Sequence, residues 1–173
     1  MVDFAGWSMP VQYSSIVTEH LAARSAAAIF DVSHMGRLQF SGGFARQFLD
    51  YLLTRRCTDM KPGQIRYSLL TSENGGILDD VLVYCLRDPD GHEYFQLVVN
   101  ASNRGKVWDW IHLHLQTTHG DWSAEQVRCT DVTEQTVMLA IQGPVAVEIV
   151  RALISTSLPT LKYYRSTQCK FVD

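Results

Sequence analysis

The sequence predicts an α+β fold in which a ferredoxin-like unit with an added strand is inserted in a second, incomplete α+β subdomain. Between Val32 and about Asp131, strand and helix patterns follow in the order β, α, β, β, β, α, β, which is typical of a ferredoxin-like unit with an extra strand. Further helix and strand patterns flank this stretch. We therefore expect 1–31 plus 132–173 to form the incomplete subdomain and 32–131 to form the inserted one.

Composition places the chain among soluble globular proteins. It has 173 residues, of which 46% are hydrophobic and 19% charged, and its net charge is −3. Lys and Arg never form a run, so nucleic acid is not an expected partner. No apolar run approaches the roughly 18 residues of a membrane span, and the amino terminus does not read as a signal peptide. We expect no membrane partner.

The cysteines and histidines are dispersed, with no C-x-x-C pair and no Cys/His cluster. Reduced, buried thiols and no metal site are therefore predicted. The cysteines are Cys57, Cys85, Cys129 and Cys169.

The amino-terminal third predicts an arm, a helix and a strand. Residues 1–13 are aromatic-rich and read as an irregular or extended arm. Ser14 or Ser15 offers a helix N-cap before an alanine-rich segment that runs to Ala28. The segment Ile29 to Gly36 follows as a strand.

A second helix is expected to start at Ser41-Gly42-Gly43 and to end near Arg55 and Arg56, whose charge suits a helix C-terminus. Its apolar face comprises Phe44, Phe48, Tyr51 and Leu52.

Two adjacent acids interrupt a predicted hairpin. The turn around Asn74 joins apolar, β-branched segments on both sides. Asp79 and Asp80 lie inside the second strand, so their side chains point to opposite faces. A buried carboxylate needs a cation, N–H donors or a ligand. The alternative is an edge strand whose two acids are partly solvated.

Asn100 is a second polar residue at the junction of two predicted elements, because it ends the next apolar strand and precedes a helix. Polar groups at strand ends are often binding residues. Alternatively, Asn100 or Ser102 is simply the N-cap of the helix marked by Val107 and Ile111.

The last third predicts a short strand over 137–141, then a helix over 145–154 with Pro144 at its first position. The tail shows no convincing pattern, although Phe171 and Val172 read as the start of a strand whose partner is missing. No internal repeat is evident.

Five motifs, in order, resemble the aminomethyltransferases of the glycine cleavage system, the T-protein family. The motifs are MVDFAGWSMPVQYSS, AIFDVSHMG, GGILDDVLVY, LVVNAS and LAIQGP. The resemblance spans the whole chain but only about the amino-terminal half of the family protein. It implies one folate-binding domain that lacks its C-terminal half, acting on tetrahydrofolate with the lipoyl H-protein as partner. It also implies a cytoplasmic location, or the mitochondrial matrix in a eukaryote.

The resemblance also implies roles for individual residues. Asp80 matches the catalytic acid, which leaves Asp79 a structural role. The implied folate-contacting residues are Met35, Tyr67, Tyr84, Val98 and Asn100. Without the resemblance, core packing is the favoured interpretation of Met35 and of the two tyrosines.

Three alternatives remain open on the sequence alone. The chain resembles folate-binding modules of sarcosine or dimethylglycine oxidising enzymes, and a paralogue that assists iron–sulfur cluster maturation. A non-catalytic folate-binding fragment is the third alternative. The implied reaction itself transfers an aminomethyl carbon to tetrahydrofolate, releasing ammonia and forming 5,10-methylenetetrahydrofolate.

Overall fold

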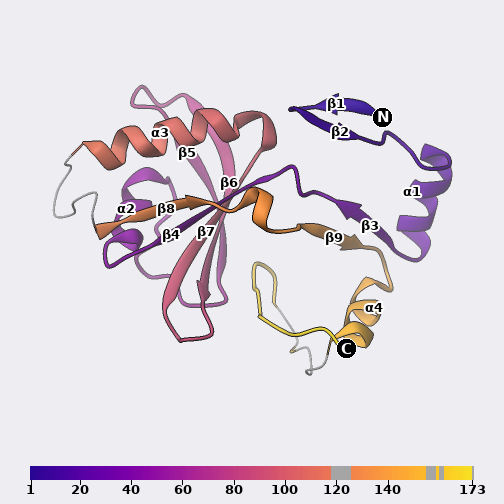
Figure 1. Ribbon diagram of the computed structural model, residues 1–173. Helices are drawn as coiled ribbons and strands as arrows, with labels where there is room; N and C mark the ends of the chain where they lie inside the picture. The colour runs from indigo at the N-terminus through magenta and orange to yellow at the C-terminus, as the bar shows by residue number, and fades with distance from the viewer. Residues whose placement is uncertain (118–125, 155–158, 160–161, 173) are drawn as a thin grey trace. The chain divides into compact units, whose positions relative to one another are not determined.

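A computed structural model describes residues 1–117, 126–154, 159 and 162–172 of the chain (Figure 1). The fold mixes helices with antiparallel sheets. It divides into two compact units: unit 1 is Met1–His34, Val137–Leu161 and Thr167–Asp173, and unit 2 is Met35–Thr136 with Lys162–Ser166.

Unit 2 is built on a five-stranded sheet of order β5-β6-β7-β4-β8, in which all neighbours are antiparallel. Its strands are β4 (Gly36–Ser41), β5 (Ile65–Thr71), β6 (Ile77–Arg87), β7 (Glu93–Val99) and β8 (Arg128–Asp131). Its helices are α2 (Ala45–Leu52) and α3 (Arg104–Gln116), with the short 3-10 turns η1 (Ala101–Asn103) and η3 (Thr133–Gln135).

One face of this sheet packs against α2 and α3. Alternate residues of β6 are buried, beginning at Asp79 and continuing through Val81 and Val83, as expected for a strand with one face on a core. These strand residues share one hydrophobic cluster with Phe48 of α2 and Ile111 of α3. The sheet therefore has a helix face and an opposite face, which we call the site face.

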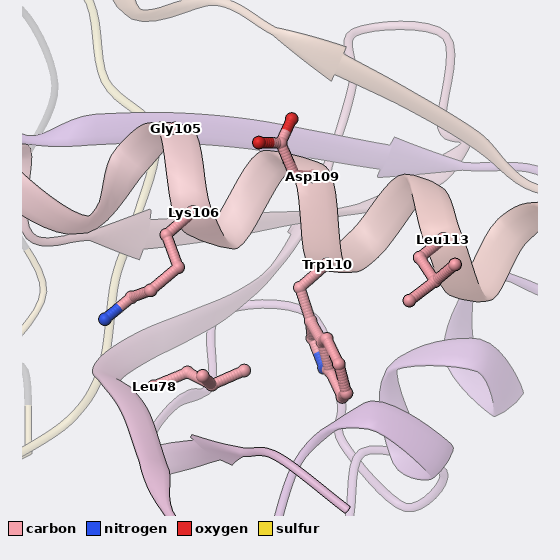
Figure 2. Close-up of a pocket in the computed structure, with 6 residues that line it drawn as sticks. All are labelled: Leu78, Gly105, Lys106, Asp109, Trp110 and Leu113. Atoms are coloured by element: carbon pink, nitrogen blue, oxygen red, sulfur yellow. The ribbon is translucent and has the colours of Figure 1, made fainter.

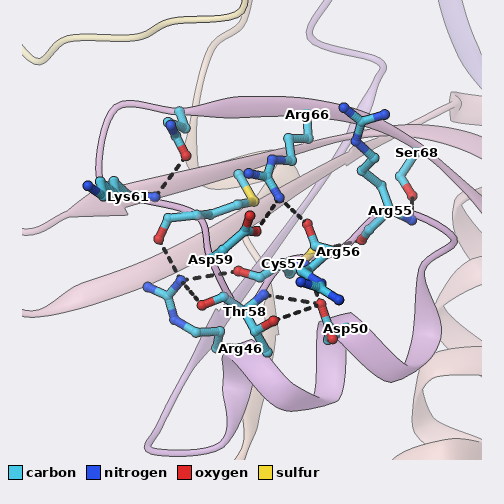
Figure 3. Close-up of polar contacts among 12 residues, drawn as sticks. Arg46, Asp50, Arg55, Arg56, Cys57, Thr58, Asp59, Lys61, Arg66 and Ser68 are labelled. Carbon is cyan, nitrogen blue, oxygen red and sulfur yellow. Dashed lines mark hydrogen bonds and ion pairs between the residues drawn. The ribbon is translucent and has the colours of Figure 1, made fainter.

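The loop between α2 and β5 is held by polar contacts, several of them partly buried (Figure 3). The Arg46 guanidinium donates to the carbonyl oxygens of Cys57, Thr58 and Met60, at 3.1, 3.2 and 2.6 Å. Asp50 accepts from the backbone N–H groups of Cys57 and Thr58. These bonds satisfy backbone groups that helix and sheet leave unpaired, and they fix the point at which β5 begins.

Unit 1 contains two small antiparallel sheets and two helices among its described residues. The strands are β1 (Val2–Phe4), which pairs with β2 (Trp7–Met9), and β3 (Ala28–Asp31), which pairs with β9 (Leu139–Gln142). The helices are α1 (Ile16–Ser25) and α4 (Ala146–Leu153). The predicted N-cap is confirmed, because the Ser15 hydroxyl accepts from the N–H of Thr18.

A local arrangement recurs in both units. In unit 2, Asp131 accepts from the N–H of Thr133 at 2.9 Å, and the Thr133 hydroxyl accepts from the N–H of Arg37 at 3.0 Å. Beyond β4, Gly42 has a φ of +108° and lies so close to Gln126 that a Cβ would be 2.2 Å from the Gln126 carbonyl oxygen.

Unit 1 repeats each of these contacts with different residues. Asp31 accepts from the N–H of Ser33 at 2.9 Å, and the Ser33 hydroxyl accepts from the N–H of Met138 at 3.1 Å. Gly143 has a φ of +130°, and a Cβ there would lie 2.4 Å from the Ala26 carbonyl oxygen. The sequence shows no evident internal repeat, yet these local contacts recur in both units. Few residues are identical between the copies, so the duplication shows only in geometry.

The duplication extends past both helices. Leu53, after α2, forms an isolated antiparallel bridge with Leu70 of β5, and Ile154, after α4, forms one with Phe171. The prediction that the Phe171 strand has no partner is thus wrong. Val172 also donates its N–H to the Leu153 carbonyl at 2.9 Å.

Other boundaries differ from expectation for local reasons. The predicted strand from Ile29 to Gly36 is broken, because Asp31 accepts from Ser33 and turns the chain. The second helix starts only at Ala45, since Gly42 is left-handed, and it ends at Leu52, before Arg55 and Arg56.

The carboxy-terminal expectations need two further corrections. Pro144 lies in a turn before α4 and not inside the helix. Part of the tail belongs to unit 2, because Ile65 donates its N–H to Tyr164 and Gln64 bridges to Arg165. The stretches 155–158, 160–161 and 173 of the predicted 132–173 segment lie outside the described residues. No helix in the described part of the chain is long and apolar enough to cross a membrane.

Candidate functional site

Strand register places several of the expected site residues on the site face. Residues directly opposite one another on neighbouring strands share a face. Tyr67 of β5 pairs with Leu82 of β6, and Leu82 pairs with Val98 of β7. Asp80 and Tyr84 lie two residues to either side of Leu82, so they point the same way. The site face thus carries two phenol rings, a carboxylate and an apolar floor.

A β-bulge immediately precedes the two acids. Leu70 pairs with Asp79 while Thr71 pairs with Ile77, so Leu78 is an extra residue on β6. Bulges bend a strand and redirect its side chains. Beyond the bulge, Asp79 is 3% exposed and faces the helices, whereas Asp80 is exposed. The prediction that the two acids face opposite ways is confirmed.

Asn100 joins the two acids. Its side-chain nitrogen donates to Oδ1 of Asp80 at 2.8 Å and to Oδ1 of Asp79 at 2.9 Å. Its backbone N–H donates to Oδ2 of Asp79 at 2.9 Å. Asn100 occupies the cap position of η1, but its side chain makes no capping hydrogen bond. Its side chain therefore serves the acids and not the helix.

Tyr67 completes a contact with the exposed acid. Its hydroxyl donates to Oδ2 of Asp80 at 3.4 Å, while the Tyr67 residue as a whole is 48% exposed. Partial desolvation, together with the negative charge of Asp80, raises the pKa of Tyr67 above its ordinary value. Burial raises the pKa of Tyr84 in the same direction. Both phenols stay neutral donors near pH 7.

Met35 lies at the end of this face. Gly36, the first residue of β4, pairs with Val99, the last residue of β7. Met35, which precedes β4, and Asn100, which follows β7, therefore lie at adjacent strand ends. The Met35 carbonyl accepts from the Arg37 guanidinium at 2.6 Å. The structure therefore gathers all six expected residues on or beside the site face of unit 2.

Three residues beside the site were not predicted from the sequence. Asn103 donates to Asp79 at 2.6 Å, Gln96 pairs with Tyr84, and Arg37 pairs with Val98. Gln96 and Arg37 could be predicted only from the strand register, which pairs these polar positions of β7 and β4 with the site residues. Val83, which follows Leu82 on β6, is buried on the helix face and does not line the site face.

The structure also contains an open groove elsewhere. It has a volume of about 590 Å³ and runs along α3 against the bulge of β6 (Figure 2). Its lining is Leu78, Gly105, Lys106, Asp109, Trp110 and Leu113. The α3 helix packs on the helix face, so this groove does not contain the residues of the site face.

Further reactive groups are the four cysteine thiols and a cluster of two acids and a histidine on one hairpin. Cys57 and Cys85 are buried as expected, Cys129 is partly buried, and Cys169 is exposed, which corrects the prediction of buried thiols. Asp88, Asp90 and His92 cluster on the β6–β7 hairpin with ligand atoms within 4.8 Å of one another. The Asp88 carboxylate accepts a hydrogen bond from the backbone N–H of His92 at 2.8 Å.

A sheet face that presents tyrosine rings, a carboxylate and an amide over an apolar floor is typical of a binding domain for a flat, polar ligand. The comparisons with known proteins identify the family. The chain matches the family described as the GCVT N-terminal domain over residues 1–173. It belongs to that family.

Individual relatives agree with this assignment. The chain is 44% identical over 164 residues to an aminomethyltransferase of Desulforamulus reducens and 40% identical over 164 residues to one of Oceanobacillus iheyensis. Each alignment covers 95% of the chain and 42% of the relative. The crystal structure of glycine cleavage system aminomethyltransferase T from Bartonella henselae superposes with a TM-score of 0.78 at 31% identity, covering 95% of this chain and 42% of that one. The chain thus spans less than half the length of these relatives.

Proposed function

We propose that the chain supplies the folate-binding face and the catalytic acid of a glycine cleavage system aminomethyltransferase. The observation that carries this proposal is the position of Asp80. Its carboxylate is exposed on the site face, between the Tyr67 hydroxyl and the Asn100 amide. The family assignment and the aminomethyltransferase relatives support the same reaction.

The proposed reaction moves one carbon. The donor is an aminomethyl group on the lipoyl sulfur of the H-protein, and the acceptor is tetrahydrofolate. The bonds from that carbon to sulfur and to the amine break, and bonds to N5 and N10 of the folate form. The two protons released by N5 and N10 end on the sulfur and on the departing amine, giving a thiol and ammonia. The products are dihydrolipoyl H-protein and 5,10-methylenetetrahydrofolate.

The residues of the site face suit the parts of this reaction. As ammonia leaves, an iminium-like positive charge develops on the carbon, and a fixed carboxylate such as Asp80 stabilises it. The rings of Tyr67 and Tyr84 offer surfaces for a pterin to stack on. Val98 and Met35 provide apolar contact, and Asn100 offers an amide. Holding the pterin close to the incoming carbon supplies much of the remaining rate.

We also propose that unit 2 is a ferredoxin-like unit with one added strand. The partial order β8-β4-β7-β6 within the sheet, with β5 outside it, supports a ferredoxin-like unit with one added strand. We take this unit and unit 1 together as one folate-binding domain, which corresponds to 42% of the Desulforamulus reducens relative.

The proposal is tested with a restored protein, in which the 173-residue chain is joined to the carboxy-terminal remainder of the Desulforamulus reducens relative. We expect ammonia release from aminomethylated H-protein that depends on tetrahydrofolate. Sarcosine and dimethylglycine should give no product. The intact Desulforamulus reducens protein is the control.

Two outcomes would favour the alternatives. Demethylation of sarcosine or dimethylglycine, with an added electron acceptor, would indicate the oxidase-type module. Tight tetrahydrofolate binding by the restored protein without any transfer would indicate a non-catalytic folate-binding fragment. The 173-residue chain tested by itself spans 42% of the Desulforamulus reducens relative. It should bind tetrahydrofolate weakly and turn it over hardly at all, because any positioning groups in the remainder of that relative are not in the sample.

A further inference from the structure

Asp79 is a buried carboxylate that the proposed reaction does not use. It is 3% exposed, and it lies on the helix face of β6. Three donors reach it: the backbone N–H of Asn100 at 2.9 Å, the Asn100 side chain at 2.9 Å and the Asn103 side chain at 2.6 Å. Charge-assisted bonds of this kind offset the cost of burying an ionised acid.

The Asn100 amide can take only one orientation in this environment. Its nitrogen is surrounded by Oδ1 of Asp79, Oδ1 of Asp80 at 2.8 Å and the Asp80 carbonyl oxygen at 3.2 Å. All three atoms are acceptors, so the NH₂ end must face them. The amide oxygen of Asn100 then points away from the acids. No donor among the described residues makes a hydrogen bond to this oxygen, so it is available to an N–H group of a ligand.

We infer that Asp79 and Asn103 are positioning residues, which act through Asn100 to aim the Asp80 carboxylate and to present the Asn100 oxygen to the bound ligand. This inference rests on the proposed function, because it assigns the aim of the acid that the transfer uses. Asn103 orients Asp79, Asp79 orients the Asn100 amide, and the Asn100 amide holds Asp80.

Replacing Asp79 by Asn should disturb this chain of hydrogen bonds, because it removes one acceptor oxygen. An amide at position 79 has one acceptor oxygen, while Asn100 and Asn103 together present three donors to the wild-type carboxylate. The new NH₂ group faces one of those donors, which is an unfavourable contact between two donors. Rotation of the Asn100 side-chain amide removes this contact at the lowest cost in free energy. Its oxygen would then lie beside the Asp80 carboxylate, and repulsion would displace the acid.

The first arm of the test measures turnover in the restored protein. Asp79→Asn should lower kcat by roughly tenfold, the scale of a small misplacement of a reacting group. In an Asp80→Asn background, the same change should cause no further loss. Ser102→Ala, an exposed change on the same turn, is the control.

The second arm uses the 173-residue chain without substrate. The side-chain NH₂ signals of Asn100, followed by ¹H–¹⁵N NMR, should shift in Asp79→Asn and Asn103→Ala but not in Ser102→Ala. Losses in kcat that multiply across Asp79→Asn and Asp80→Asn, together with unchanged Asn100 signals, would overturn the inference. Absence of any transfer by the restored wild type would instead count against the proposed function, and the NMR arm would still decide the positioning role.

Discussion

Asp79 and Asp80 are neighbours on β6 whose carboxylates lie on opposite faces of the sheet, yet both accept a hydrogen bond from the same Asn100 side chain, at 2.9 and 2.8 Å. One acid is buried and the other is exposed. Strand geometry separates them, and the residue that ends the next strand reconnects them. A buried structural acid and an exposed reactive acid are thereby parts of one hydrogen-bond network.

Tyr67 should matter more for its ring than for its hydroxyl. The hydroxyl contact with Asp80 is long, at 3.4 Å, and exposed, so Tyr67→Phe should weaken tetrahydrofolate binding by only about twofold to fivefold. Tyr67→Ala also removes the stacking surface and should weaken binding by roughly tenfold or more. Calorimetric titration of both variants measures the difference. Equal losses in both would show that the hydroxyl carries the effect.

Arg37 should be important for stability. It is 2% exposed, and its guanidinium donates to the carbonyl oxygens of Met35, Thr133 and Thr136. Arg37→Met leaves these acceptors without that donor and should lower the free energy of unfolding by about 3 kcal/mol. Urea denaturation followed by circular dichroism provides the measurement. Arg55→Met, an exposed change, should cost little, and equal effects would refute this role.

Asp131 should make stability depend on acid pH. Burial would raise its pKa, but hydrogen bonds from Thr133 and Arg104 outweigh burial and hold the pKa below its ordinary value of 3.8. The unfolded chain then binds more protons, so this contribution is present above about pH 4 and is lost as pH falls through the folded-state pKa. Asp131→Asn should flatten the decline in thermal stability between pH 5 and pH 3. An unchanged slope would contradict the assignment.

The four cysteines should differ in reactivity. Burial raises the pKa of Cys57 and of Cys129 to about 12, and it raises the pKa of Cys85 as well. The thiolate is the reactive form, so iodoacetamide at pH 8 should label the exposed Cys169 first. Mass spectrometry of the native protein identifies the labelled site. Rapid labelling of a Cys169→Ser variant would show that a buried thiol is accessible.

Local patterns were sufficient to predict the elements that bear the site. The hairpin around Asn74, the opposite facing of Asp79 and Asp80 and the position of Asn100 at a strand end all follow from turn chemistry and from the two-residue period of a strand. The mixed helix and sheet class follows from the same patterns.

Long-range relationships were not predictable in the same way. The pairing of Tyr84 with Gln96 depends on register between strands, and the shared amide of Asn100 depends on where β7 ends beside β6. The duplicated arrangement around Asp31 and Asp131 is carried by backbone hydrogen bonds and left-handed glycines, with few matching side chains. A single sequence contains no direct signal for such contacts.

Asp80 is the residue on which the proposed function depends most, and one kinetic comparison tests its role directly. Ammonia release from aminomethylated H-protein is measured for the restored protein and for its Asp80→Asn variant, with thermal unfolding followed in parallel. Asn keeps the shape of the side chain and removes its charge, so turnover should fall by a factor on the order of 10² or more while the unfolding temperature is nearly unchanged. An Asp80→Asn variant that releases ammonia at the wild-type rate would contradict the assignment of the catalytic acid.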